Sequence, residues 1–436
     1  MALGLTCDSC ASGPERASRE SASLMSTRAS IGTWRGSELK PSREIDFLAR
    51  LVEIDTDSNL KTGYVDCANV IKKEAESIGL KTEIYDSAEM ASDKKPRPNV
   101  VVRLDLGAPE TILLATHYDV VAPGAGWTRE PFKLTLEGDR AFGRGAADDK
   151  AAIVCAMGAL RELTDMSPKA NVALLACPEE EIGGELGLGY VVNQVKLRGD
   201  AAIVLDASPS VVSIGASGIL WGKVVVRGKQ GHAGYPHTAK NAIDEALPFL
   251  ERLSKYSKIR ERVKSKIPAP PDSPHKWIWG RFTVTMLNAG QKENVIPGEC
   301  EARFDLRVCP DENYESAKKG FARYFEKLRN TQKVEATLEY TLQNPSNYFT
   351  DPKHPLVRKF ALAANEAFGQ KIPIAGELGG NDGHYFAKVG IPVISFGPIR
   401  DDCRFHGVDE FVYLRDIDLV KKTIVELVSN WNVEVK

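Results

Sequence analysis

The sequence predicts an α/β protein in which helices cover both faces of a mostly parallel sheet and a smaller α+β unit is inserted. The first observation is a set of three short apolar runs, TILLA, ANVALLAC and AAIVL, each followed by acidic or imidazole side chains. The second is that helical patterns lie between these runs, as expected for a parallel sheet covered on both faces. The third is a length of 436 residues, which is too long for one ordinary core and favours two domains.

Composition and charge place the chain among soluble globular proteins. Apolar residues make up 43% and charged residues 27% of the sequence, and the formal net charge is −2. This charge gives no electrostatic reason to expect nucleic acid, and no apolar stretch approaches the roughly 18–20 residues that span a bilayer. The eight cysteines are scattered, and no secretory signal is evident, which favours a reducing cytoplasm. We therefore expect a cytoplasmic protein without nucleic-acid or membrane partners.

The first forty residues differ from the rest of the chain. Residues 1–40 are rich in Ser and Arg and show no periodicity, so we expect a disordered extension. Cys7 and Cys10 form a CxxC pair, but no second CxxC accompanies it, which disfavours a metal or redox site. The folded chain is expected to begin near Ser42, and Met25 is an alternative translation start.

Residues 41–215 are predicted to form the first part of a catalytic domain. Apolar residues recur at helical spacing from Arg43 to Leu80. Strands are expected at Lys81–Tyr85, Asn99–Leu104, Thr111–Ala115, Ala170–Cys177 and Ala201–Leu205, and helices at Ala151–Leu163 and Leu186–Val195. In such sheets, ligands bind beyond the carboxyl ends of the strands. The last three strands carry their acids or histidine at that end.

Residues 216–344 are predicted to form a separate, ferredoxin-like unit. The expected order is strand, helix, strand, strand, helix, strand: Leu220–Arg227, Asn241–Leu253, Trp277–Leu287, Cys300–Val308, Tyr314–Leu328 and Val334–Leu342. This unit is an insertion, because helix and strand patterns resume in Pro355–Phe368 and Pro392–Phe396, within residues 345–436. The basic, proline-containing stretch Lys255–Lys276 is interpreted as a solvated surface loop.

Five side chains at predicted strand ends and turns match the needs of a two-metal hydrolase. Two divalent ions about 3.5–4 Å apart require two outer ligands each and one shared carboxylate. The five candidates are His117, Asp148, Glu181, Asp206 and His406. Each alone has a structural explanation, such as a helix N-cap or an exposed acidic turn, so the prediction depends on the whole set.

Neighbouring acids complete the predicted chemistry. Asp119 follows His117 in an HxD pair and is expected to accept the proton of the ring nitrogen that faces away from the metal. Glu179-Glu180-Glu181 places three carboxylates in sequence, and these repel one another unless a cation compensates. One Glu can coordinate a metal while its neighbour acts as general base, with a raised pKa.

Short motifs then follow one another along the chain: THYDVVAPG, GRGAADDK, PEEEIGG, LDAS, GKQGHAGYP, KENVIPG, DLR, GGNDGHYF and HGVDEF. With these motifs the sequence from about Arg43 onward resembles the dinuclear zinc hydrolases, the family of acetylornithine deacetylase, succinyl-diaminopimelate desuccinylase, aminoacylase and glutamate carboxypeptidase. The resemblance implies a zinc-exopeptidase-like catalytic domain with an inserted lid domain, through which the protein is expected to form a homodimer.

The resemblance also divides the ligands between the metals. It implies that His117 and Asp206 hold one metal, that Glu181 and His406 hold the other, and that Asp148 bridges them. Zinc is the expected ion, and cobalt or manganese would suit the same ligands.

Other positions acquire roles only through the resemblance. It implies that Glu180 is the general base, that Glu179 is peripheral, and that the peptide bond between Asp148 and Asp149 is cis.

Five further residues match family positions that contact substrate. His232 matches a histidine that reaches across the dimer and would stabilise the oxyanion. Asn294 and Arg307 match substrate-binding residues of the lid, where an arginine suits a carboxylate. Gly379 and Gly380 match a glycine-rich loop beside the substrate.

The sequence departs from the family pattern at three places. Asp206 stands where several deacylases have Glu, and Asn381 where Thr or Ser is frequent. The Lys255–Lys276 insertion lengthens the lid and would reshape the substrate pocket.

The implied reaction is metal-assisted hydrolysis of the amide bond of an N-acyl amino acid. A dipeptidase or carboxypeptidase is the alternative, and Arg307 does not separate the two because both substrates carry a carboxylate. An inactive, metal-free binding module is the remaining alternative. Loss of a ligand or of Glu180 would indicate such a module, and the sequence retains them all.

Overall fold

The structure, a computed structural model, describes residues 42–432. The predicted disordered extension and the Cys7–Cys10 pair lie outside this range. Among the residues described, no helix is both long and apolar enough to cross a membrane.

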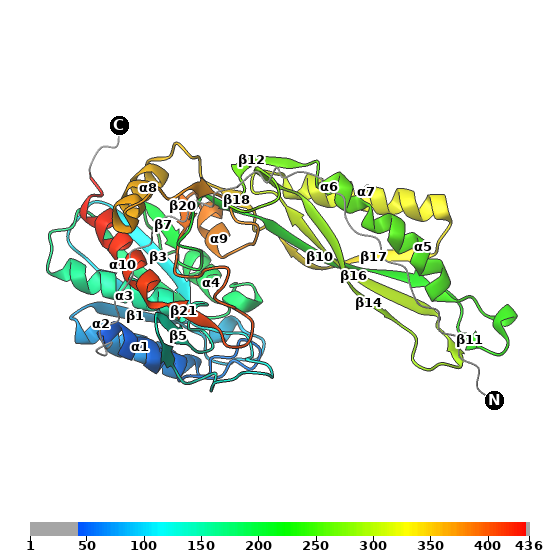
Figure 1. Cartoon of the computed structure of the whole chain (residues 1–436), viewed down its shortest axis with the longest axis horizontal. Helices are drawn as coiled ribbons and strands as arrows, with labels where there is room; N and C mark the ends of the chain where they lie inside the picture. The colour runs from blue at the N-terminus through cyan, green and yellow to red at the C-terminus, as the bar shows by residue number, and fades with distance from the viewer. Residues whose placement is uncertain (1–41, 433–436) are drawn as a thin grey trace, which may run out of the picture. The chain divides into compact units, whose positions relative to one another are not determined.

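A mixed eight-stranded sheet forms the centre of the larger α/β part (Figure 1). In spatial order its strands are β1 (Lys81–Asp86), β2 (Pro98–Leu104), β6 (Asn171–Cys177), β3 (Thr111–His117), β7 (Ala201–Val204), β20 (Val393–Ser395), β8 (Val212–Ser213) and β19 (Ile374–Ala375). The central strands β6, β3, β7 and β20 are mutually parallel, whereas at one edge β2 is antiparallel to β6, and β1 is antiparallel to β2. The predicted mostly parallel sheet is therefore confirmed at the centre, where the site is built.

Side chains alternate between the two faces of this sheet, as successive residues of a strand must. In β3, Ile112 and Leu114 join one buried cluster, and Leu113 and Ala115 join the other. The first cluster packs against α1 (Arg43–Val52), α2 (Tyr64–Ser77), α3 (Lys150–Thr164), α8 (Pro355–Phe368) and α10 (Leu414–Ser429). The second packs against the short helices α4 (Leu188–Asn193) and α9 (Gly383–Lys388). Strands buried on both faces explain the continuous apolar runs in the sequence.

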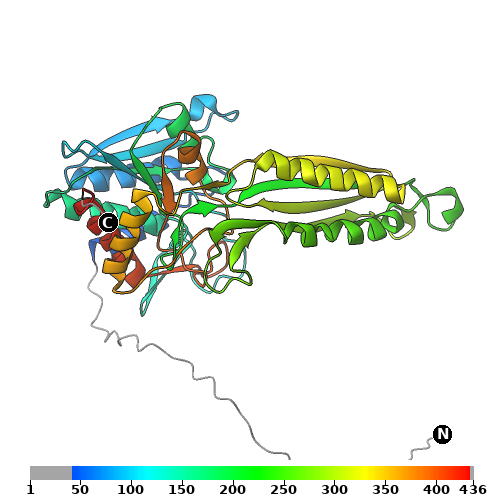
Figure 2. The same ribbon diagram turned by 90° about the horizontal axis from the view of Figure 1, so that it is seen from above.

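A second, antiparallel sheet has its own core. Its strands are, in order, β14 (Arg281–Ala289), β16 (Glu299–Val308), β10 (Gly218–Arg227) and β17 (Ala336–Asn344), and two helices run alongside, α5 (Ala242–Ser254) and α7 (Tyr314–Gln332) (Figure 2). The core between helices and sheet is aromatic: Phe304 lies 4.7 Å from Phe321, and Phe249 lies 5.9 Å from Phe325, between ring centroids. The chain order β-α-β-β-α-β agrees with the expected ferredoxin-like pattern.

The interpretation of Lys255–Lys276 as a solvated surface loop is wrong. The segment contains α6 (Tyr256–Arg260) and β12 (Lys264–Pro268), and β12 pairs with β13 (Trp277–Trp279). Along β12 the lysines are exposed, while Ile267 is buried and joins Ile278 in the core of the larger sheet. The basic residues therefore occupy the outer face of an amphipathic strand, which conceals a short period-2 pattern.

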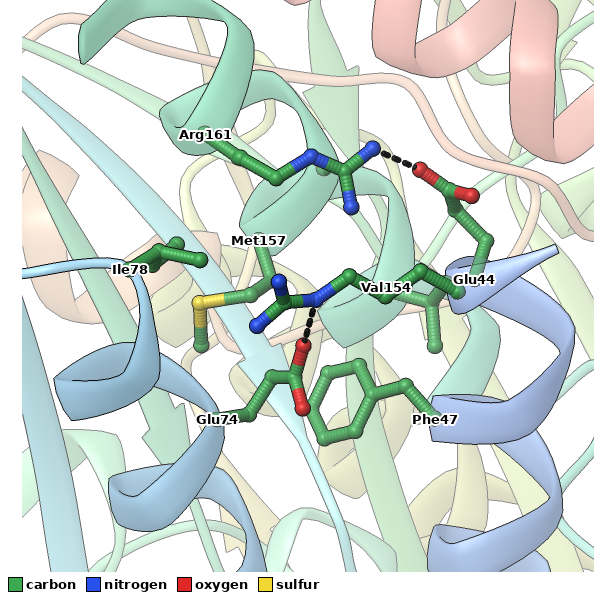
Figure 3. A pocket seen from close by; sticks show the side chains of 9 residues that line it. Glu44, Phe47, Glu74, Ile78, Val154, Met157 and Arg161 are labelled. Atoms are coloured by element: carbon green, nitrogen blue, oxygen red, sulfur yellow. Dashed lines mark hydrogen bonds and ion pairs between the residues drawn. The ribbon is translucent and has the colours of Figure 1, made fainter.

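Ion pairs join the helices α1, α2 and α3 around a small cavity of about 10 Å³ (Figure 3). Arg43 and Arg50 on α1 both donate to the buried Glu74 on α2, the former at 2.6 Å. Arg161 on α3 pairs with Glu44 on α1. A cavity of this size holds about one water molecule, so the cluster holds the helices together and is not a substrate site.

Replacing Glu74 with Gln should lower the free energy of unfolding by about 1–2 kcal/mol at neutral pH, because two arginines lose their partner but stay partly exposed. Burial opposes ionisation, yet hydrogen bonds from Arg43 and Arg50 hold the pKa of Glu74 below its usual value. A carboxyl whose pKa is lower in the folded protein stabilises the fold fully at pH values above its unfolded pKa of about 4.3. This stabilisation is lost as the pH falls through the pKa of the folded protein. Denaturant titrations over a pH series should show the difference between wild type and variant shrinking at acidic pH.

The matched control is Glu76→Gln, in the same helix, where an exposed glutamate lies 3.7 Å from Lys72. It should have little effect at any pH. A Glu74→Gln effect that did not change with pH would contradict the ion-pair explanation.

Candidate active site

The ends of three neighbouring parallel strands bring the predicted site together. His117 is the last residue of β3 and lies opposite Cys177, the last residue of β6. Glu180 and Glu181 follow β6 in a short 3-10 turn, and Asp206 follows β7. Parallel neighbours end at the same edge of a sheet, and this edge carries the acids as expected.

Side-chain atoms that could bind metal form two groups, which are linked through Asp148 and are termed the ligand groups. In one group, atoms of His117, Glu180 and Asp206 lie within 4.8 Å of one another, and in the other so do atoms of Asp148, Glu181 and His406. The groups are linked because His117 Nε2 lies 3.0 Å from Asp148 Oδ1. His406 Nε2 lies 3.1 Å from Asp148 Oδ2 and 3.1 Å from Glu181. Asp148 thus contacts both histidines, one through each oxygen, as a bridging carboxylate must.

The charges of this cluster have to be neutralised, either by protons or by cations. Burial, and then the charge of Asp206, raises the pKa of Glu180 well above its usual value. Burial and the charge of Asp148 raise the pKa of Asp206 to about 7. Hydrogen bonds to Asp148 and Glu181 raise the pKa of His406 to about 10. Without metal, protons would therefore have to neutralise these groups. Two divalent ions would neutralise the carboxylates instead, and the donor set of imidazoles and carboxylates fits them.

The peptide bond between Asp148 and Asp149 is cis, as the resemblance implied. Asp148 precedes α3, and Asp149 is fully buried and accepts a hydrogen bond from the Thr116 hydroxyl at 2.6 Å. Thr116 directly precedes His117, so this contact links the end of β3 to the start of α3.

Asp119 orients more than its neighbouring histidine. His117 Nδ1 lies 3.0 Å from the backbone carbonyl oxygen of Asp119 and 3.4 Å from its carboxylate. The carboxylate itself accepts hydrogen bonds from the backbone amides of Glu180 at 3.1 Å and Glu181 at 3.3 Å. Asp119 thereby ties the end of β3 to the acidic turn after β6. The HxD motif predicted the contact between His117 and Asp119, but it gave no sign of the hydrogen bonds from Glu180 and Glu181.

Glu179 is neutralised by an arginine that sequence reasoning missed. Its carboxylate accepts a hydrogen bond from the buried Arg97 at 2.5 Å, and Glu179 itself adopts a left-handed backbone conformation with φ of +67°. The side chain therefore pairs with Arg97, while Glu180 and Glu181 join the ligand groups. Arg97 directly precedes β2 and lies far from Glu179 in the sequence, so no local pattern predicted this ion pair.

Glu410 is the second residue that sequence reasoning missed. Its carboxylate is fully buried, pairs with Arg144 at 2.5 Å, and accepts hydrogen bonds from the backbone amides of Gly145, Ala147 and Asp148 at 3.1, 2.9 and 3.0 Å. Arg144 also donates to the carbonyl oxygen of Gly407 at 2.9 Å, next to His406. One ion pair therefore holds both the loop of Asp148 and the loop of His406. The only sequence signal was an acid directly before the buried strand β21 (Phe411–Tyr413).

A cavity of about 680 Å³ is lined by every member of the ligand groups except His117. Gly379 and Gly380 line it, together with a turn at residues 270–274 and the loop of Phe405. Cavities of about 300–1,000 Å³ hold small organic ligands. A Cβ atom at Gly380 would lie 3.0 Å from the carbonyl oxygen of Ser217, so a side chain is disfavoured there.

Asn381, a departure from the family pattern, has a structural role beside this cavity. Its side-chain amide donates to Glu377 at 2.7 Å and to Ser395 at 2.9 Å, and its oxygen accepts from the Tyr348 hydroxyl at 2.9 Å. An amide offers two donors and an acceptor, which a Thr or Ser hydroxyl cannot match. Burial, and then the charge of Asp206, raises the pKa of Glu377 to about 8.

The remaining predicted residues do not join this cavity within one chain. His232 lies in β11 (Gly231–His232), which pairs with β15 (Val295–Ile296) and places Asn294 beside it, since Asn294 accepts a hydrogen bond from the Ala233 amide at 2.9 Å. Arg307 lies in β16 and donates to Asp305 at 2.9 Å. Neither these residues nor Asp119 line the cavity.

Known proteins resemble this chain in sequence and fold. A sequence model described as peptidase family M20/M25/M40 matches residues 113–430. A succinyl-diaminopimelate desuccinylase from Verminephrobacter eiseniae is 31% identical over 336 residues, which cover 74% of this chain and 79% of that protein. The resemblance inferred from the motifs is thereby confirmed.

Two solved structures share the fold. An M20-family metallo-carboxypeptidase from Sulfolobus solfataricus has a TM-score of 0.71 at 20% identity, covering 89% of this chain and 99% of its own. Human carnosine dipeptidase 1 has a TM-score of 0.72 at 16% identity, covering 88% and 96%. At these identities the likeness concerns the fold alone, and it agrees with the predicted fold class.

Replacing Glu410 with Gln should weaken metal binding by roughly 10–100-fold, because the amides that orient Asp148 and the guanidinium of Arg144 lose a charged acceptor. Competition with a chromogenic chelator measures the affinity, and circular dichroism checks that the variant is folded. Glu185→Gln, which removes an exposed acid from the turn after Glu181, is the control and should bind metal as wild type does. Equal affinities for all three proteins would refute an orienting role for Glu410.

Proposed function

Because the chain belongs to peptidase family M20/M25/M40, we propose that it cleaves the amide bond of an N-acyl amino acid and that five residues hold its metals. The protein is a dinuclear metal-dependent hydrolase of linear amide bonds. In the proposed assignment, His117 and Asp206 hold one ion, Glu181 and His406 the other, and Asp148 bridges them. The position of Asp148 between the two histidines is the observation that carries this assignment.

Glu180 is the proposed general base. When bound, the metals acidify a water molecule and polarise the scissile carbonyl. The Glu180 side chain has no hydrogen bond or ion pair to any other described residue, although it lies in the ligand group of His117 and Asp206. It is therefore free to take a proton from the attacking water and to return it to the leaving amine. Its burial favours a raised pKa, which suits that exchange.

Zinc is the proposed ion, because the donor set combines imidazole and carboxylate. We place the protein in the cytoplasm on the strength of its cysteines: the six that the structure describes are all buried and unpaired, as in a reducing compartment.

A homodimer through the second sheet completes the proposed site. β14 is an edge strand, and its Met286 and Leu287 are 51% and 52% exposed, as is Leu247 on α5 at 56%. An exposed apolar edge strand is a template for pairing with another copy. In such a dimer His232 would reach the partner's metals and stabilise the oxyanion, while Asn294 and Arg307 would bind the substrate carboxylate.

The substrate follows from the relatives only in outline. The desuccinylase relative supports an N-acyl amino acid. A dipeptide is the alternative, and it is favoured by one observation: the cavity lining includes no Lys or Arg from the described chain, so it offers a succinyl carboxylate no cation. Assays of N-acetyl and N-succinyl amino acids beside simple dipeptides, with zinc, cobalt or manganese, would decide between them.

Replacing Glu180 with Gln should lower turnover by roughly 10²–10⁴-fold while both metals remain bound, because the amide cannot accept a proton. Turnover on the best substrate and metal content by atomic spectroscopy measure the two effects. Glu185→Gln serves again as the control and should retain activity. Wild-type turnover in a metal-loaded Glu180→Gln protein would rule out this base.

A mixed dimer tests whether His232 acts in trans. Protomers with His232→Ala and protomers with Glu180→Gln should each be inactive alone. Combined, one of the two sites would regain both groups, so about a quarter to a half of wild-type activity per site is expected if the sites are independent. A verified mixed dimer without recovered activity would refute the trans arrangement.

A further inference from the structure

We propose that Asp272 and Asp401 make this enzyme selective for amide substrates that carry a protonated amine. The inference deepens the proposed function and rests on it, because it concerns the cavity over the proposed metals. Both residues line that cavity, Asp272 from the turn between β12 and β13 and Asp401 from the loop that leads to His406.

The charge of the cavity points to a cationic ligand. Its acids comprise four in or beside the ligand groups and three outside them, and within the described chain no Lys or Arg lines it. Two divalent ions would balance the first four. Of the others, Glu377 is engaged by Asn381, whose amide donates to it at 2.7 Å. Asp272 and Asp401 are therefore the acids of the wall outside the ligand groups whose side chains have no hydrogen-bonding partner within the described chain.

Neither aspartate has a bonding partner among the described residues of the protein. Among the residues that the structure describes, neither side chain has a hydrogen bond or an ion pair, and both residues are exposed. Nearby acids differ: Asp402 accepts a hydrogen bond from the Tyr413 hydroxyl at 2.7 Å, and Asp311 accepts one from the Lys266 amide at 3.0 Å. A free carboxylate in a substrate-sized cavity is available to a ligand ammonium group, which makes strong charge-assisted hydrogen bonds.

The hairpin that carries Asp272 is fixed to the catalytic core. Backbone hydrogen bonds join Ala269 to Lys276 at 3.0 Å and Gly376 to Pro268 at 3.0 Å. Ile278 and Ile267 pack against Gly376 so closely that a Cβ atom there would lie 2.6 and 2.9 Å from them. Gly376 directly precedes the cavity-lining loop of residues 377–380, so hairpin and loop are held together.

The turn itself is stiff. Prolines occupy positions 270, 271 and 274 and restrict the backbone around Asp272. Asp272 has φ of +66°, a conformation that Asp and Asn adopt more readily than other non-glycine residues. The carboxylate is thus presented on a rigid wall, and Asn can replace it without altering the turn.

Two pairs of substrates that differ only in an amine test the proposal. N-acetylornithine and N-acetylnorvaline differ in a side-chain amine, and glycylleucine and N-acetylleucine differ in an α-amine. We expect wild type to prefer the amine-bearing member of at least one pair by roughly ten-fold or more in kcat/KM, and the pair that shows the preference identifies where the amine lies. Asp272→Asn and Asp401→Asn should each reduce this preference several-fold and leave the neutral member unaffected.

Asp402→Asn is the matched control, since it removes the same charge one position away and its amide oxygen can still accept from Tyr413. It should keep the wild-type preference. Binding gives a second readout: in metal-loaded Glu180→Gln protein, calorimetry should show the same ratio of Kd values within a pair, and the same loss on Asp272→Asn or Asp401→Asn.

The outcomes separate this inference from the function beneath it. If wild type hydrolyses neutral members as well as amine-bearing ones, or if the aspartate variants lose both equally, the selectivity is refuted while amide hydrolysis stands. If metal-loaded wild type neither hydrolyses nor binds any of the four compounds, the selectivity is refuted, and amide hydrolysis itself fails only if the N-succinyl amino acids and the other dipeptides are not cleaved either.

Discussion

The mutual repulsion of buried carboxylates at one edge of the sheet is the constraint on which the rest of the structure depends. Parallel strands bring Glu180, Glu181 and Asp206 to one place, and the loop before α3 adds Asp148. Carboxylates so close together are stable only beside positive charge. Protons or bound cations within the cluster, and arginines around it, must therefore compensate these charges.

The residues around the cluster hold it in place through hydrogen bonds to backbone amides, which leave the carboxylate oxygens of the proposed ligands free to bind metal. The carboxylate of Asp119 accepts hydrogen bonds from the amides of Glu180 and Glu181. The carboxylate of Glu410 accepts one from the amide of Asp148. Arg97 forms an ion pair with Glu179, so this third acid is not available to bind metal. Each contact fixes a backbone segment while the ligand side chain itself stays available, which is how supporting residues tune a metal site.

Sequence patterns predicted the parts of this structure that repeat or that end a strand. His117 and Asp206 were predictable because each follows an apolar run of β3 or β7. Arg97 and Arg144 were not, because an ion pair between distant segments leaves no periodic trace. The hairpin around Asp272 was misread for a related reason: lysines on its outer face hid Ile267, whose burial depends on a surface that another part of the chain provides. The roles proposed for Glu180 and His232 came from family resemblance, since spacing alone does not distinguish a base from a ligand.

The pairing of Arg144 with Glu410 also constrains how the protein is made. The proposed ligands run from His117 to His406, and the ion pair between Arg144 and Glu410 holds the His406 loop against the Asp148 loop. The proposed donors of the second ion can therefore be complete only after the segment that carries His406 and Glu410 has been synthesised and has folded against the Asp148 loop. Until that ion pair has formed, the backbone amides that orient Asp148 lack their acceptor, so the two halves of the proposed metal site would be completed together.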